Sequence, residues 1–72
     1  METEIVNNLR DFFLASKELE SLRIEIAEAE ATGKGDVVNL LRITRKITND
    51  RSEAARFLNT NIHKIEQLGI AV

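Results

Sequence analysis

The segment Thr32-Gly33-Lys34-Gly35-Asp36 is the one clear interruption in a chain of 72 residues that contains no proline. Gly33 can adopt the left-handed backbone conformation that ends many helices. Asp36 suits the N-cap of a following helix, because its carboxylate can accept hydrogen bonds from free backbone N–H groups. The interruption divides the chain into two nearly equal halves, so we predict a long antiparallel helical hairpin of the all-α class.

Both halves carry apolar residues at the three- and four-residue steps that are typical of amphipathic helices. We expect one domain with a helix over about residues 3–31, a turn over 32–36 and a helix over about 37–68. Eight acids and three bases lie in residues 1–31, and four acids and seven bases in residues 32–72, so antiparallel folding brings opposite charges together. The predicted seam between the helices contains Leu9, Phe12, Leu19, Ile26, Leu41, Ile47, Leu58 and Ile65.

The second half contains a polar stretch from Asn49 to Ser52 that allows an alternative architecture. Asp50 and Glu53 have the spacing of a capping box, which is a common start of a helix. The alternative is therefore three helices with a break near Asn49–Ser52. We favour a continuous second helix whose polar turn lies on the surface.

The width of the apolar surface on the first helix indicates a second neighbour besides the other half of the hairpin. A chain this short buries only about 60% of its unfolded surface and is marginally stable alone. We therefore expect a homo-oligomer, with a dimer that forms a four-helix bundle as the favoured form. The candidate oligomer or partner interface consists of Val6, Phe13, Leu14 and Ile24.

The composition argues against several classes of protein. With no cysteine there is no disulfide scaffold, thiolate metal site or cysteine nucleophile. No apolar run approaches the roughly 20 residues of a membrane span, and the acidic N-terminus lacks the apolar core of a signal peptide. No phosphate-binding loop, metal-ligand spacing or catalytic arrangement is evident, so we expect a cytoplasmic, non-enzymatic protein without a cofactor or metal.

A polar band interrupts the predicted seam near its middle. Helical-wheel positions place Arg23 and Arg51 within the apolar arcs of the two halves, with Glu20 close by. The first interpretation is that the arginines reach the surface or pair with a carboxylate such as that of Glu20, and that the polar band fixes register or oligomeric state. The second is that Arg23 and Arg51 bind a small anion at a subunit interface.

The second half also carries basic residues on its outer side, and these are candidate nucleic-acid contacts. They are Arg42, Arg45, Lys46, Arg56 and Lys64. The sequences Ser52-Glu53-Ala54-Ala55-Arg56 and Leu68-Gly69-Ile70 resemble parts of the helix-turn-helix of Fis-type DNA-binding domains. Alignment of both parts leaves the turn itself missing, and the net charge of −2 weakens attraction to nucleic acid.

Three hypotheses on function follow from the sequence. The first is a non-enzymatic oligomeric adaptor, inhibitor or regulator that acts through protein–protein contact. The second is a regulator that binds nucleic acid through the basic side of the second helix. The third is an oligomer that sequesters a small anionic ligand.

Overall fold

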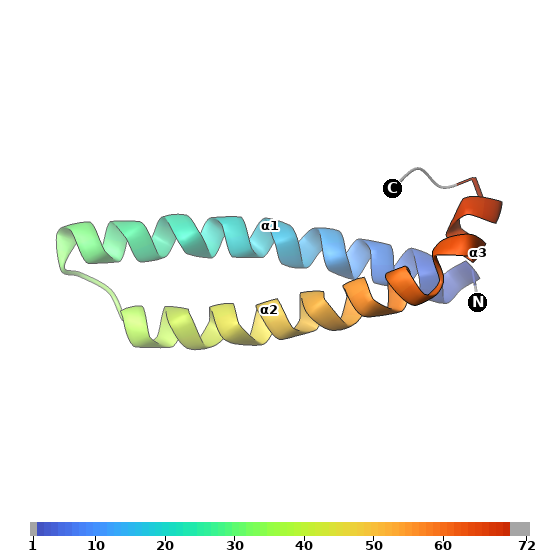
Figure 1. Cartoon of the computed structure of the whole chain (residues 1–72). Coiled ribbons are helices and arrows are strands. Elements are labelled where there is room, and N and C mark those ends of the chain that lie inside the picture. Colours follow the sequence, from blue (N-terminus) through green and yellow to red (C-terminus); the bar gives the residue numbers. More distant parts are fainter. Residues whose placement is uncertain (1, 70–72) are drawn as a thin grey trace.

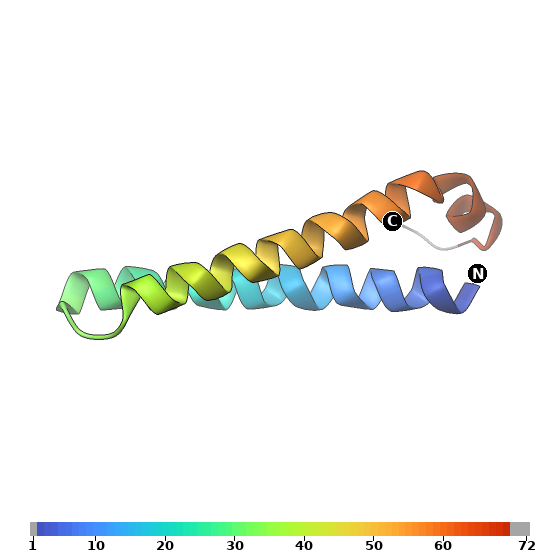
Figure 2. The same cartoon turned by 90° about the horizontal axis from the view of Figure 1, so that it is seen from below.

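The computed structural model describes residues 2–69 and contains three helices in that range. α1 spans Glu2–Thr32 and α2 spans Val37–Thr60, and they pack against each other in antiparallel directions (Figure 1). Figure 2 shows that their axes cross at a shallow angle. The short helix α3, Ile62–Gln67, lies at the end of the hairpin where α1 begins. The predicted all-α helical hairpin is confirmed.

The turn between α1 and α2 uses the residues that the sequence indicated. Gly33 adopts a φ of 68°, and its N–H donates to the carbonyl oxygen of Ala29 at 2.9 Å, which ends α1. Gly35 has a φ of 101°, and a Cβ there would lie 3.3 Å from the Cβ of Ala29. The carboxylate of Asp36 then accepts from the N–H of Asn39 at 3.0 Å and caps α2.

The second half of the chain differs from the continuous helix expected over about residues 37–68. The α-helix passes without a break through residues 49–52, so the break considered there is absent, and α2 ends at Thr60 instead. The side-chain amide of Asn61 donates to the carbonyl oxygen of Phe57 at 2.8 Å, and its backbone N–H is shared between the carbonyl oxygens of Phe57 and Leu58. These local hydrogen bonds stabilise a C-terminal cap, after which α3 changes direction.

The core formed by the single chain is small. Among the residues that the structure describes, Ile5 and Ile65 are the fully buried large side chains, and the other buried apolar residues are Ala15, Leu22, Ala29 and Ala54. Alanine removes little apolar surface from water, so these contacts contribute only modestly to stability. Of the predicted seam, Ile65 is buried and most others are half-buried, whereas Phe12 and Leu41 are exposed, so Leu41 does not belong to the seam within one chain.

The shape of the hairpin explains this small core. The principal extents are 50 × 18 × 15 Å, and the radius of gyration is 15.5 Å, compared with about 11 Å for a compact domain of this length. The accessible surface is 5564 Å², whereas a compact monomer of 8.1 kDa exposes about 4,500 Å². Because each long helix has essentially one long neighbour, most of its circumference remains in contact with water.

Candidate interaction surfaces

Two grooves of different chemistry run along the two sides of the α1–α2 seam. Leu9 of α1 lines one groove and Asp11 of α1 lines the other. Positions i and i+2 of an α-helix are about 200° apart around its axis, so these two side chains point to nearly opposite sides. The side of the hairpin with the groove that Leu9 lines is named the apolar face. The side with the groove that Asp11 lines is named the acidic face.

The apolar face contains a groove of about 640 Å³ near the open end of the hairpin. Its one charged lining residue in the described part of the chain is Arg56, at the edge. Ala55 belongs to a row along α2 with a spacing of seven residues that includes Thr48 and Leu41, and Ile62 of α3 follows Ala55 at the same spacing in the sequence. Because seven residues make about two helical turns, this row extends the apolar face toward the turn. The groove is lined by Leu9, Phe12, Ser52, Ala55, Arg56, Leu58, Asn59, Ile62 and Ile65.

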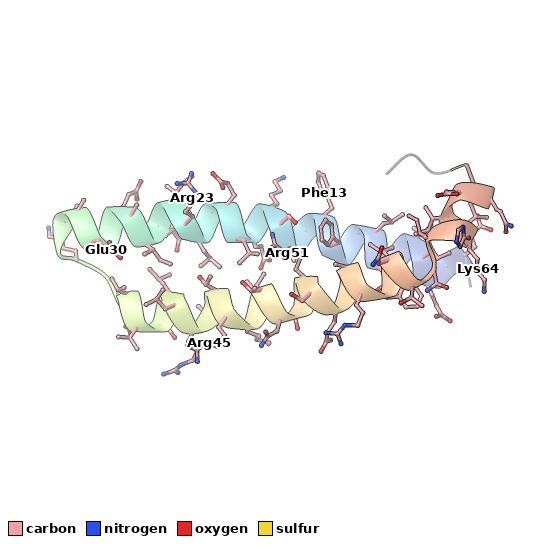
Figure 3. The ribbon with its side chains drawn as sticks, in the orientation of Figure 1. Phe13, Arg23, Glu30, Arg45, Arg51 and Lys64 are labelled. Atoms are coloured by element: carbon pink, nitrogen blue, oxygen red, sulfur yellow. The ribbon has the colours of Figure 1, made fainter. Side chains whose placement is uncertain are left out.

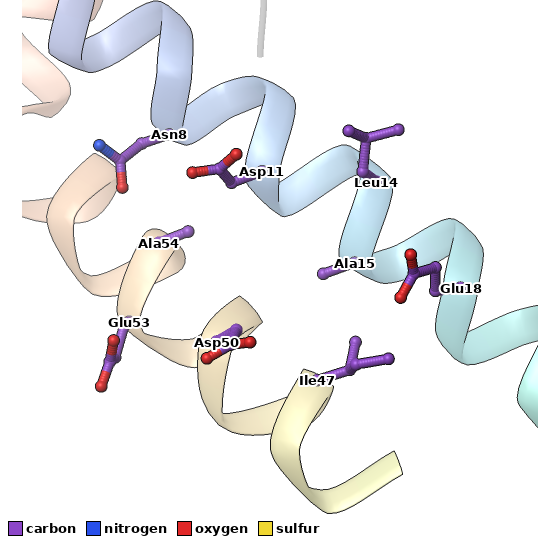
Figure 4. Close-up of a pocket in the computed structure, with 9 residues that line it drawn as sticks. All are labelled: Asn8, Asp11, Leu14, Ala15, Glu18, Ile47, Asp50, Glu53 and Ala54. Carbon is purple, nitrogen blue, oxygen red and sulfur yellow. The ribbon is translucent and has the colours of Figure 1, made fainter. Parts of the chain in front are cut away.

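The acidic face contains a groove of about 390 Å³ at the middle of the hairpin (Figure 4). Ala15 of α1 and Ala54 of α2 form its floor, where the two helices approach each other. Asp11 and Glu18 from α1, and Asp50 and Glu53 from α2, surround it, whereas Leu14 lies on its rim. The whole set is Asn8, Asp11, Leu14, Ala15, Glu18, Ile47, Asp50, Glu53 and Ala54.

The structure does not bring Arg23 and Arg51 together within one chain. Figure 3 shows Arg51 on the side of α2 that faces α1, and Arg23 on the side of α1 away from α2. Arg51 is half-buried and has no ion-pair partner among residues 2–69. The polar band inferred from the wheel is therefore divided, with Arg51 in the seam and Arg23 outside it.

Arg23 forms an ion pair with Glu20, as the first interpretation of the polar band predicts. Its Nη2 lies 2.6 Å from Oε1 of Glu20, and its Nε donates to Oε2 at 3.3 Å, so the pairing is bidentate. This hydrogen bonding, and secondly the positive charge of Arg23, lower the pKa of Glu20 below its ordinary value. The same hydrogen bonding, and secondly the negative charge of Glu20, raise the pKa of Arg23. Both side chains are mostly exposed, so water screens the pair and its contribution to stability is small.

The four residues assigned to an oligomer or partner interface do not form one surface. All of them are exposed, with Phe13 the most so at 69%. Leu14 lies on the rim of the acidic groove. Val6, Phe13 and Ile24 follow the outer side of α1, where Figure 3 shows Phe13 pointing away from α2. These three residues are named the outer stripe.

The five basic candidates for nucleic-acid contact are all exposed but do not form a continuous basic groove. Arg42 and Lys46 line a shallow groove together with Glu18 and Asp50. Arg56 lies at the edge of the apolar groove, and Lys64 lies on α3. Arg45 extends into solvent from α2 (Figure 3). Acidic side chains thus interrupt the basic surface, which weakens its attraction for phosphate.

Comparison with known protein families, with curated proteins and with solved structures finds no match for this chain. Its function is therefore inferred from these surfaces and from their chemistry.

Neither a metal site nor a membrane span is found within residues 2–69. No cluster of three or more His, Asp or Glu side chains there is arranged to hold a metal ion. The helices of the same range lack the length of uninterrupted apolar sequence that crossing a membrane requires. The apolar groove could not be predicted as a unit from the sequence, because the change of direction after Asn61 brings Ile62 and Ile65 to it. The nearest indication of this groove in the sequence was the spacing of seven residues between Ala55 and Ile62.

Proposed function

We propose that this chain is a non-enzymatic interaction protein, whose subunits dimerise into a four-helix bundle that contacts a protein partner. The observation that carries the proposal is the imbalance between the buried and the exposed apolar side chains. Within residues 2–69 the buried set has six members, three of them alanine, whereas nine large apolar side chains are exposed. The exposed set is Val6, Phe12, Phe13, Leu14, Ile24, Val38, Leu41, Ile43 and Leu68.

The magnitude of the exposed area also supports an oligomer. The chain exposes roughly 1,000 Å² more than a compact monomer of its mass. A standard protein–protein interface covers about 800 Å² on each partner. One further copy of the hairpin can therefore cover most of this excess.

The other two hypotheses receive less support from the geometry. A nucleic-acid regulator requires a continuous basic stripe, and here Glu18 and Asp50 lie in the same groove as Arg42 and Lys46. A site for a small anion requires converging donors, and here Arg23 is paired with Glu20 on the outer side of α1. We therefore retain protein–protein contact as the proposed function.

Sedimentation velocity and light scattering of the full chain at micromolar concentration test this proposal. We expect a mass of twice 8.1 kDa. A monomeric mass across the whole concentration range, with cooperative unfolding, would contradict the oligomer. Steep loss of a DNA or RNA complex with added salt would instead favour the nucleic-acid hypothesis.

A further inference from the structure

We infer that a second copy of this chain docks on the apolar face, and that the acidic face and the outer stripe remain uncovered in the dimer. This inference rests on the proposed function. It adds the surface that forms the contact, which is the apolar face, and the molecule that binds there, which is a second copy of the chain. It assigns the contact to the side of the hairpin that carries Leu9, Phe12, Leu41, Ala55 and Ile62.

The symmetry of a dimer limits which face a second copy can use. A two-fold contact places the same patch of both subunits against itself, so the patch must be compatible with its own copy. Two acidic faces in contact would place four carboxylates of each subunit, those of Asp11, Glu18, Asp50 and Glu53, opposite each other. Arg42 and Lys46, which share a neighbouring groove with Glu18 and Asp50, offset only part of this negative charge. Like charges in an interface repel and lose their hydration, which opposes association. The apolar groove has Arg56 as its one charged lining residue and avoids this cost.

The size of the apolar face also fits a second copy. The hairpin is 50 Å long and 18 Å across, so one broad face is large enough for the roughly 800 Å² that each partner contributes to a standard interface. A second hairpin has the same length and presents apolar side chains along it. Helices aligned in this way form a four-helix bundle, in which each helix gains the second neighbour that it lacks in one chain.

Arg51 limits the arrangement of the two copies. It is half-buried in the seam, at about mid-length of the hairpin, and is unpaired within residues 2–69. An arginine in an otherwise apolar layer disfavours arrangements that leave its guanidinium without water or an acceptor. A polar residue of this kind selects one register at some cost in stability.

Matched substitutions of two leucines distinguish the two broad faces. Leu41 is 52% exposed and Leu14 is 50% exposed, and they belong to the apolar face and the acidic face respectively. In Leu41→Glu the new carboxylate gains Arg45 four residues away. In Leu14→Glu two bases, Arg10 and Lys17, and two acids, Asp11 and Glu18, lie three or four residues away and offset one another. Electrostatics within each helix therefore favours the folding of the first variant and is nearly neutral for the second. A greater loss of association in Leu41→Glu is then attributable to the interface.

We expect Leu41→Glu to raise the dimer dissociation constant by about tenfold or more, because a carboxylate buried at an apolar contact loses its hydration. Leu14→Glu and Phe13→Glu are expected to keep the dissociation constant within about threefold of the wild type. Sedimentation equilibrium measures all three constants, and circular dichroism checks that each variant is helical.

Thiol protection gives a second measurement that does not depend on a disruptive substitution. The chain has no cysteine, so Leu41→Cys and Leu14→Cys each introduce a single thiol. We expect slow alkylation of the first and rapid alkylation of the second at concentrations where the dimer forms. The two rates should converge on dilution to the monomer.

The outcomes separate this inference from the proposed function. A dimer that dissociates with Leu14→Glu or Phe13→Glu, but not with Leu41→Glu, overturns the assigned face and leaves the oligomer intact. Equal protection of the two thiols in a dimer also overturns it. A wild-type chain that is monomeric at every concentration overturns both the face and the proposed oligomer, and leaves the apolar face to a different protein.

Discussion

At the scale of single residues, the Glu20–Arg23 pair gives a prediction on pH. Arg23 lowers the pKa of Glu20, first through its hydrogen bonds and then through its charge. A carboxylate whose pKa is lower in the folded state adds stability above its unfolded pKa, and this contribution disappears as the pH falls through the folded value. We expect Arg23→Gln to return the pKa of Glu20 to its ordinary value, as measured by NMR titration of the side-chain carboxyl group.

Lys17→Gln is the matched control, because Lys17 is also three residues from Glu20 but forms no ion pair with it. The control should keep the lowered pKa of Glu20. Equal effects of the two substitutions would show that general charge, rather than the bidentate pair, lowers this pKa. Neither variant should change the stability at neutral pH measurably, since the pair is mostly exposed.

Arg23 and Arg51 also show how far single residues could be predicted from the sequence. The wheel placed both in apolar arcs, and for Arg51 the half-buried position in the seam agrees with this. Arg23 lies outside the seam because its long side chain reaches Glu20 one turn earlier on the same helix. A wheel gives the direction of the Cα–Cβ bond, but not the rotamer that a local partner selects.

At the scale of secondary-structure elements, Ile5 connects the beginning of α1 to α3. Ile5 is fully buried and lines a small pocket with Lys64, Gln67 and Leu68. We expect Ile5→Ala to reduce the free energy of unfolding by about 2–4 kcal/mol, because it removes a buried side chain and leaves a cavity. Urea unfolding at fixed protein concentration measures this change.

Ile24→Ala provides the matched control within the same helix. Ile24 is exposed, and alanine has the higher helix propensity, so the expected loss is below about 1 kcal/mol. Similar losses in the two variants would mean that α3 does not depend on Ile5. A larger loss in Ile24→Ala would place the outer stripe in a contact that the single chain lacks.

The elements themselves were predictable to different degrees. The hairpin and its turn follow from local chemistry at Gly33 and Asp36, and the structure confirms them. The end of α2 at Thr60 was not predicted, because the apolar spacing that includes Leu58 continues past the break through Ile62 and Ile65. Asn61 was the available signal, since its short polar side chain can hydrogen-bond to the preceding turn. The spacing of Asp50 and Glu53 did not start a new helix, because no residue near them forces the preceding one to end.

At the scale of the whole molecule, we expect the stability of an elongated hairpin with a small core to depend on association. If the dimer dissociates and unfolds in one step, a tenfold increase in protein concentration stabilises the folded state by about 1.4 kcal/mol. We expect the Tm to rise by roughly 3–6 °C for each tenfold increase in concentration, since the two chains together unfold with the entropy of a mid-sized domain. Differential scanning calorimetry between about 10 μM and 1 mM measures this dependence.

Leu41→Glu is the informative comparison, because it changes an exposed residue of the hairpin and leaves its buried core intact. Its Tm should be lower than that of the wild type and nearly independent of concentration, because a monomer unfolds without a change in the number of molecules. A wild-type Tm that does not change with concentration would mean that the core of Ile5, Leu22 and Ile65 is sufficient for one chain. The apolar face would then be available to a different protein rather than occupied by a second copy.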